Sequence, residues 1–211
     1  MQSTRLCLVR HGETAWNAGG RVQGQLDVPL SETGLAQARA LARVLSKERF
    51  SAIHSSDLTR ARQTAQPVAD LLKKDVLVSE SLRERHYGAF QGMTYAEAKE
   101  RIPEGYARFR AKDPEYDFGT GESLKRFNDR SLLFIQEVVE RHEGKNLLLI
   151  THGGVLEMVY RHATGRGLST PRDFEIPNAA LNRVEIGAAG WRVEVWADIG
   201  HLSIALDDLP D

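Results

Sequence analysis

The chain has few of the features that mark secreted, membrane or nucleic-acid-binding proteins. It contains a single cysteine, Cys7, and so can form no disulfide within one chain. No apolar run approaches the roughly 18 residues of a membrane-spanning helix, and the apolar stretch at residues 6–9 is too short for a signal sequence. The net charge is −1 over 211 residues, which predicts no basic surface for nucleic acid or anionic lipid. We therefore expect a cytoplasmic protein with neither kind of partner.

What the sequence does contain is typical of one globular domain of the α/β class. Hydrophobic residues make up 41% and charged residues 27%, and 211 residues are enough for one well-formed core. Short apolar runs that predict buried strands occupy residues 6–9, 50–54, 76–78 and 146–151. Segments with helical periodicity alternate with these strands. They occupy residues 32–47, residues from a cap at Ser56 or Asp57 to about 72, residues 122–142 and residues 154–164.

Two further segments complete the expected organisation. Residues 180–186 and 191–197 read as a late hairpin, and the charged, aromatic stretch at 94–118 reads as a short helical insertion covering the site. Strands that alternate with helices predict a three-layer α/β/α sandwich with a mostly parallel central sheet and an antiparallel element at its end. We expect residues 1–211 to form a single domain.

Two of these strands end in the same kind of motif. The first runs into Arg10-His11-Gly12, and the strand at 146–151 runs into His152-Gly153-Gly154. In open α/β sheets, ligands bind outside the carboxyl ends of the strands. We therefore expect His11 and His152 to share one site, where the glycines after His152, Gly153 among them, leave room for backbone N–H groups to approach an anion.

The residue types around these histidines suit phosphate chemistry. A histidine nucleophile must be neutral, and a neighbouring cation such as Arg10 lowers its pKa. The helix after the second strand carries Arg60 and Arg62 near its N-terminus, where backbone N–H groups also favour phosphate. Residues two apart face different sides of a helix, so only one of these arginines can point into the site.

Arg10-His11-Gly12-Glu13-Thr14, followed by Trp16-Asn17, resembles the signature of the histidine phosphatase superfamily, which also includes the phosphoglycerate mutases. The resemblance implies that His11 is the nucleophile and carries a phosphoryl group during turnover. It selects Arg60 as the inward arginine, through a Ser-x-Leu-x-Arg-Ala motif, and leaves Arg62 in solvent. It assigns phosphate contacts to Asn17. By its own chemistry, His152 either protonates the phosphoryl oxygens or donates hydrogen bonds to them as charge builds up.

Other segments carry the resemblance along the chain. Residues 82–92 are similar to the family's acid-bearing loop, which implies that Glu84 donates the proton to the leaving group and that Tyr87 lies at the site. Gln23-Gly24 resembles a substrate-side loop. The family fold that follows is the phosphoglycerate mutase-like sandwich. Neither a metal nor a cofactor is expected, because arginines and histidine supply the positive charge.

The branch of the family decides the expected reaction. Four features favour a phosphatase that acts on a small phosphorylated metabolite. They are the short length, the Val22-Gln23-Gly24 loop, residues 121–124, and Tyr95 in place of a mutase lysine. The segment at residues 84–88 is mutase-like, so a mutase that depends on 2,3-bisphosphoglycerate stays the alternative. An inactive binding module and a metal-dependent hydrolase fit less well. Three arginines of the insertion either recognise an acidic substrate or only solubilise a helix: Arg101, Arg108 and Arg110.

Overall fold

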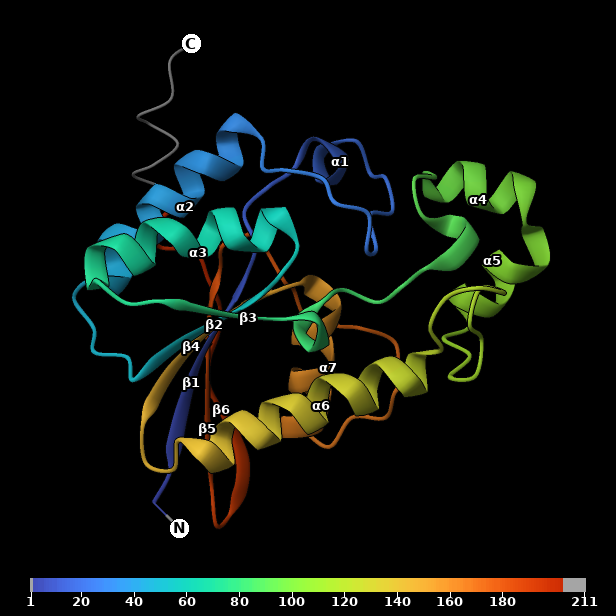
Figure 1. Ribbon diagram of the computed structural model, residues 1–211. Coiled ribbons are helices and arrows are strands. Elements are labelled where there is room, and N and C mark those ends of the chain that lie inside the picture. Colours follow the sequence, from blue (N-terminus) through green and yellow to red (C-terminus); the bar gives the residue numbers. More distant parts are fainter. Residues whose placement is uncertain (1, 203–211) are drawn as a thin grey trace.

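The computed structural model describes residues 2–202, and its centre is a mixed β-sheet (Figure 1). Within these residues the sheet has six strands in the order β3-β2-β4-β1-β5-β6. The strands are β1 (Thr4–Arg10), β2 (Ala52–Ser56), β3 (Val76–Ser79), β4 (Asn146–Thr151), β5 (Leu181–Gly187) and β6 (Gly190–Asp198). The first four run parallel, and β5 and β6 add an antiparallel hairpin at one edge. The expected fold class is confirmed.

Helices cover both faces of this sheet, as Figure 1 shows. Helices α2 (Glu32–Leu45) and α3 (Thr59–Leu72) lie on one face, and α6 (Leu124–Arg141) and α7 (Gly153–Ala163) lie on the other. Side chains of β1 alternate between the two cores, because successive residues of a strand point to opposite faces. Leu6 and Leu8 join the cluster under α6 and α7, while Cys7 and Val9 join the cluster under α2 and α3.

The boundary between β2 and α3 differs from the sequence prediction. Neither Ser56 nor Asp57 caps the helix: α3 follows Leu58, which makes no side-chain capping bond. Ser56 ends the strand instead, and the Asp57 carboxylate forms an ion pair with Arg83. The long helix also begins later than expected, at Leu124, with Ser123 as its cap. The predicted cap of α3 was wrong because tertiary partners take both side chains: Ser56 binds His152, and Asp57 binds Arg83.

The segment at residues 94–118 contains two short helices, α4 (Tyr95–Arg101) and α5 (Pro103–Arg110). They lie beyond the end of α6, at the right of Figure 1. A cluster of aromatic rings joins them to the loop after β3, with Phe109 against Tyr87, Phe90 and Phe118. The remaining short elements are α1 (Ala15–Ala18) and two 3₁₀ turns, η1 (Glu80–Leu82) and η2 (Gly88–Phe90).

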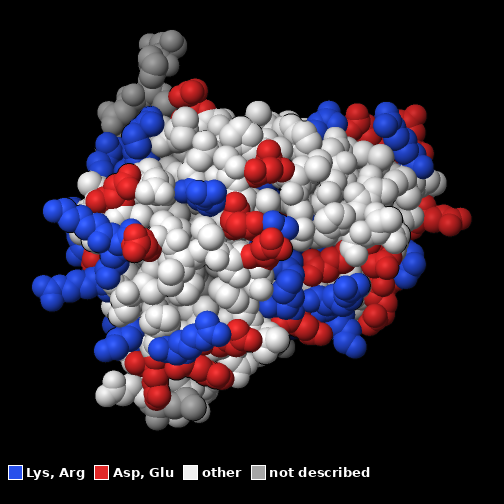
Figure 2. Space-filling model, in the orientation of Figure 1, with Lys and Arg blue, Asp and Glu red and all other residues white. Residues whose placement is uncertain are grey.

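The surface carries both signs of charge. Figure 2 shows lysine and arginine side chains interleaved with aspartate and glutamate on the face in view. Between residues 2 and 202, no helix is long and apolar enough to cross a membrane.

Candidate active site

The register of β1 and β4 brings the two histidines together. The strands are parallel neighbours, and Arg10 lies opposite Thr151, so the residues that follow them are adjacent. The His11 N–H donates to the Thr151 carbonyl oxygen at 2.9 Å. The rings of His11 and His152 meet edge to face with centroids 5.1 Å apart. Both side chains are buried, so they lie at the bottom of the site.

One ring nitrogen of His11 is left free for chemistry. Its Nδ1 lies 2.7 Å from the Gly12 carbonyl oxygen, which can only accept, so Nδ1 carries the proton. Nε2 therefore has the lone pair. Burial, and then the positive charges of Arg10 and Arg60, hold the pKa of His11 well below its ordinary value. The imidazole is therefore neutral, as a nitrogen nucleophile must be.

Arg60 comes from the first turn of α3 and is fully buried beside this nitrogen. Its Nε lies 3.3 Å from Nε2 of His11. Its other nitrogens donate to the carbonyl oxygens of Leu26 and Gly24 at 2.8 and 2.7 Å, so the guanidinium is held on three sides. Burial lowers the pKa of Arg60 to about 10, which leaves it charged at neutral pH. Arg62 is exposed on the opposite side of the helix.

Arg10 supplies a second cation at the end of β1. Its Nη1 donates to the Ile176 carbonyl oxygen at 2.7 Å. Its Nε is buried without a hydrogen-bond partner anywhere in the described chain. Gly153 lies beside it, at a position where a Cβ would be 3.5 Å from this Nε. An unpaired, buried N–H of a cation is a ready donor to an anion.

His152 offers a further donor. Its Nε2 lies 2.8 Å from the Ser56 hydroxyl, which in turn accepts from the Leu58 N–H. Among the described residues the Ser56 O–H has no other acceptor, so we assign its proton to the bond with Nε2 and the proton of His152 to Nδ1, for which residues 2–202 provide no partner. Burial and the nearby Arg60 hold the pKa of His152 well below its ordinary value, so it too is neutral.

Glu84 is anchored at the N-terminus of α7. Its Oε1 accepts from the Arg85 N–H at 2.7 Å, and its Oε2 accepts from the Gly154 N–H at 2.9 Å. A Cβ at position 154 would come within 2.1 Å of Oε1 and 2.9 Å of the Phe127 ring. Only glycine therefore allows the carboxyl group to lie against the helix end.

The remaining predicted residues border this centre. The Asn17 side-chain oxygen accepts from the Thr14 N–H in a capping box that holds the loop after His11. Gly24 has a φ of +53°, and its carbonyl oxygen accepts from Arg60. Gln23 is buried, and its Oε1 has no partner among the described residues. Tyr87 lies on the wall of the neighbouring cavity.

Three supporting residues were not predicted as site residues. Ser56, the first residue of the Ser-x-Leu-x-Arg-Ala motif, orients His152, and Thr64 accepts from the Gly12 N–H at 2.9 Å. Asn178 donates to the His11 carbonyl oxygen at 2.9 Å from the loop before β5. An isolated serine, threonine or asparagine is too common for its sequence context to single it out. For Ser56, the motif that it shares with Arg60 was the available signal.

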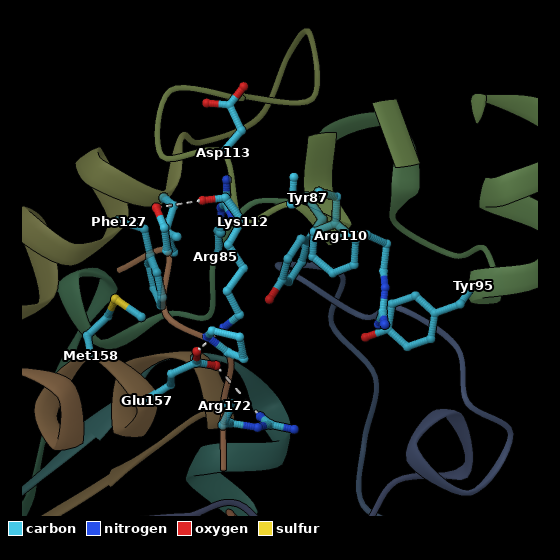
Figure 3. Close-up of a pocket in the computed structure, with 16 residues that line it drawn as sticks. Arg85, Tyr87, Tyr95, Arg110, Lys112, Asp113, Phe127, Glu157, Met158 and Arg172 are labelled. Carbon is cyan, nitrogen blue, oxygen red and sulfur yellow. Dashed lines mark hydrogen bonds and ion pairs between the residues drawn. The ribbon is translucent and has the colours of Figure 1, made fainter. Parts of the chain in front are cut away.

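A cavity of about 760 Å³ opens between α7 and the insertion (Figure 3). Gly154, whose N–H binds Glu84, is part of its wall, so the cavity leads to the catalytic carboxyl candidate. Its other walls are mainly aromatic and basic, as the residues labelled in Figure 3 show. In the described part of the chain, no group of three or more histidine, cysteine, aspartate or glutamate side chains could hold a metal ion.

Comparisons with known proteins show which families and folds the chain is similar to. A family model described as "Histidine phosphatase superfamily (branch 1)" matches residues 6–199. The metal-independent phosphoserine phosphatase of Arabidopsis thaliana is 39% identical over 203 residues, which cover 95% of this chain and 84% of that protein. A probable phosphoglycerate mutase of Serratia proteamaculans is 34% identical over 215 residues, covering 96% and 97%. The structure of Bacillus stearothermophilus YhfR superposes with a TM-score of 0.88 at 32% identity, covering 94% and 99%.

Proposed function

Since the chain belongs to the histidine phosphatase superfamily, we propose that it is a phosphatase of small phosphorylated metabolites that works through a phosphohistidine intermediate. The observation that carries the proposal is the unprotonated Nε2 of a neutral, buried His11, which accepts a hydrogen bond from Arg60 Nε at 3.3 Å. A phosphoryl group placed at this nitrogen would meet cationic donors on several sides. Phosphoryl transfer depends mostly on such positioning and charge stabilisation.

In the first step, the Nε2 lone pair of His11 attacks phosphorus in line with the leaving oxygen. The P–O bond breaks, Glu84 gives its proton to that oxygen, and the alcohol leaves. The free Nε of Arg10, the guanidinium of Arg60 and the unpaired Nδ1–H of His152 are the donors for the phosphoryl oxygens. General acid catalysis of this kind contributes roughly 10²–10⁴ in rate.

In the second step, water attacks the phosphohistidine. Glu84, now a carboxylate, accepts a proton from that water, the P–N bond breaks, and its electron pair returns to Nε2 of His11. Inorganic phosphate leaves, and the enzyme regains its starting protonation. Glu84 serves both steps because its carboxyl group is fixed at the end of α7, next to the cavity.

A metal ion is not part of this proposal. One relative is named metal-independent, and the positive charge in the cycle comes from Arg10 and Arg60. Release of phosphate that persists in excess chelator is the expected result.

A mutase is the second candidate, because relatives such as the Serratia protein are named as probable phosphoglycerate mutases. In that reaction, 2,3-bisphosphoglycerate would phosphorylate His11, and a phosphoglycerate rather than water would accept the group. The site chemistry is the same in both cases, and only the acceptor differs.

A panel of phosphorylated metabolites, assayed for phosphate release with wild type and His11→Ala, tests the proposal. We expect hydrolysis by wild type and none above background by the variant. The mutase candidate is tested with 3-phosphoglycerate and 2,3-bisphosphoglycerate together. Rapid formation of 2-phosphoglycerate with little free phosphate would establish the mutase and overturn the phosphatase.

A further inference from the structure

Glu84 lies on a loop without regular secondary structure. Residues 83–87 follow the 3₁₀ turn η1 and precede η2. Such a loop keeps its shape only if other segments of the chain satisfy its backbone polar groups. The Arg85 N–H that binds the Glu84 carboxylate belongs to the same loop, whereas the Gly154 N–H belongs to α7. The contacts that hold the loop therefore decide where this carboxyl group lies.

An arginine of α6 holds the loop on the side before Glu84. Nη1 of Arg130 donates to the Ser81 carbonyl oxygen at 2.8 Å and to the Arg83 carbonyl oxygen at 3.2 Å. The guanidinium also lies over the Phe127 ring, 5.2 Å from its centre. One nitrogen of a single side chain thus binds two carbonyl groups that shortly precede Glu84.

The carboxylate of Glu122 holds the loop on the side after Glu84. Its Oε1 and Oε2 accept from Nε and Nη2 of Arg130, both at 2.9 Å. Oε2 also accepts from the His86 N–H at 3.4 Å, and the Glu122 N–H donates to the His86 carbonyl oxygen at 2.8 Å. We call Arg130 and Glu122 the loop clamp, because together they contact the loop on both sides of Glu84.

Other segments bind the same loop at single points. The Thr151 hydroxyl donates to the Leu82 carbonyl oxygen at 2.8 Å, and the Gln25 side chain donates to the Glu84 carbonyl oxygen at 3.1 Å. Each of these bonds reaches one residue of the loop, whereas the clamp reaches residues before and after Glu84. The clamp therefore restrains the direction in which the Glu84 side chain leaves the backbone.

The clamp is partly buried, with the side chains of Arg130 and Glu122 24% and 14% exposed. Removal of Arg130 would leave the carboxylate and two loop carbonyl groups without this donor, which is costly where water is scarce. Arg130 has a second, electrostatic effect on the site. Burial is the main cause that lowers the pKa of His152, and the charge of Arg130 adds a smaller contribution. An experiment must therefore separate the geometry of Arg130 from its charge.

We propose that Arg130 and Glu122 are positioning residues that hold the Glu84 carboxyl group at the leaving oxygen. The inference rests on the proposed function, in which Glu84 gives its proton to that oxygen. An arginine suits this position because its fork binds the carboxylate through two nitrogens and leaves Nη1 for the loop. A displacement of about 1 Å in a catalytic group costs about 10² in rate. The clamp thus governs proton donation.

The test compares two substrates that differ in their need for a proton, β-glycerol phosphate and p-nitrophenyl phosphate. In Arg130→Ala, kcat/KM should fall about 10²-fold on the alkyl ester and at least about tenfold less on the nitrophenyl ester, whose phenolate leaves unprotonated. A smaller folded fraction would lower both values equally, and that result would overturn the proposal. Arg141→Ala, which removes an exposed ion pair with Glu137 on the same helix, is the matched control and should keep the wild-type ratio.

Two further variants separate geometry from charge. In Arg130→Lys the charge remains, but one ammonium group cannot hold both Glu122 and the loop, so most of the loss should persist. Glu122→Ala should change the substrate ratio in the same direction. The double alanine variant should lose about as much as the worse single variant, because both residues act through one clamp. A wild-type ratio in Arg130→Lys, or a double-variant loss equal to the product of the single losses, would contradict the clamp.

Amide hydrogen exchange tests the clamp without turnover. In Arg130→Ala the N–H groups of Arg85 and Gly154, which bind the Glu84 carboxylate, should exchange faster than in wild type, while those of β4 should not change. Unchanged exchange at both positions would overturn the clamp. If wild type hydrolyses both esters and the Arg130 variants keep its ratio, only the clamp is refuted. If wild type hydrolyses no phosphate ester, the proposed function fails, and the exchange result decides the clamp separately.

Discussion

The Nε of Arg60 lies 3.3 Å from Nε2 of His11, the nitrogen that the bond between Nδ1 and Gly12 leaves without a proton. The guanidinium is fixed there by two carbonyl oxygens of the loop at residues 24–26. In the proposed cycle Nε2 becomes bonded to phosphorus, so the Arg60 N–H loses its acceptor on the ring and gains one on the phosphoryl group. The same Arg60 N–H group therefore donates a hydrogen bond both before and after His11 is phosphorylated.

Arg60→Lys should separate charge from geometry. Lysine keeps the positive charge but cannot span His11 and both carbonyl oxygens. We expect kcat/KM to fall by about 10²–10³, as for removal of one transition-state donor, and the melting temperature to fall because Gly24 and Leu26 lose a buried donor. Arg62→Lys, exposed two residues along the same helix, is the matched control. Equal effects of the two substitutions would contradict this account of Arg60.

Glu84→Gln should affect substrates according to their leaving groups. A glutamine cannot donate the proton, so alkyl phosphates, whose alkoxides leave poorly, should lose about 10²–10⁴ in kcat/KM, which reports the first step and not the hydrolysis of the phosphohistidine. p-Nitrophenyl phosphate, whose phenolate leaves without protonation, should lose much less. Steady-state kinetics on both substrates measure the difference. Glu80→Gln, on the exposed 3₁₀ turn before it, should change neither substrate. A uniform loss on both would exclude the acid role of Glu84.

Gly154→Ala should displace the catalytic carboxyl group without removing it. The new Cβ would lie 2.1 Å from Glu84 Oε1, so the carboxyl group must move from the helix end. We expect kcat on alkyl phosphates to fall by about 10²-fold, as for other small misplacements of a catalytic group. Gly167→Ala, where the Cβ would make only an ordinary contact at 3.5 Å, is the control. Unchanged activity of Gly154→Ala would show that this position of Glu84 is not required.

His54 should make stability depend on pH below neutrality. Burial first, then His142 and Arg141, lower its pKa from 6.5 to about 4. Between pH 6.5 and about 4, His54 therefore binds a proton in the unfolded chain but stays neutral in the folded chain. The stabilising contribution is fully present above pH 6.5 and is lost as the pH falls toward 4. The melting temperature of wild type should decline more steeply over this range than that of His54→Gln. Parallel curves would contradict the assignment, and His162→Gln serves as the control.

The sequence predicted those parts of the site that depend on chain order and local pattern. Two apolar strands that each end in a histidine place His11 and His152 at one sheet edge, because parallel strands share their carboxyl ends. Residue spacing along α3 separates Arg60 from Arg62. By contrast, Ser56 or Asp57 was expected as a helix cap, since such residues before a helix favour that role. The Ser56 hydroxyl lies 2.8 Å from Nε2 of His152 instead, and neither the cap rule nor the motif that Ser56 shares with Arg60 identifies this partner 96 residues away.

The sequence pattern also could not predict which arginines line the cavity. Arg172 lies in a loop without periodicity, and it contacts the Glu157 carboxylate, which Lys112 and Arg161 also contact. The sequence left open whether the arginines of the insertion bind substrate or only solubilise a helix. The structure separates them, since Arg110 alone among Arg101, Arg108 and Arg110 borders the cavity.

The central claim is that His11 carries the phosphoryl group, and trapping that intermediate tests it most directly. Wild type is mixed with a phosphorus-labelled substrate, quenched in alkali within one turnover, and digested for mass spectrometry. Our account predicts one acid-labile, alkali-stable phosphoryl group on the peptide that contains His11, and none in His11→Ala. Label on the peptide that contains His152 would contradict it. So would full-rate phosphate release without any labelled enzyme.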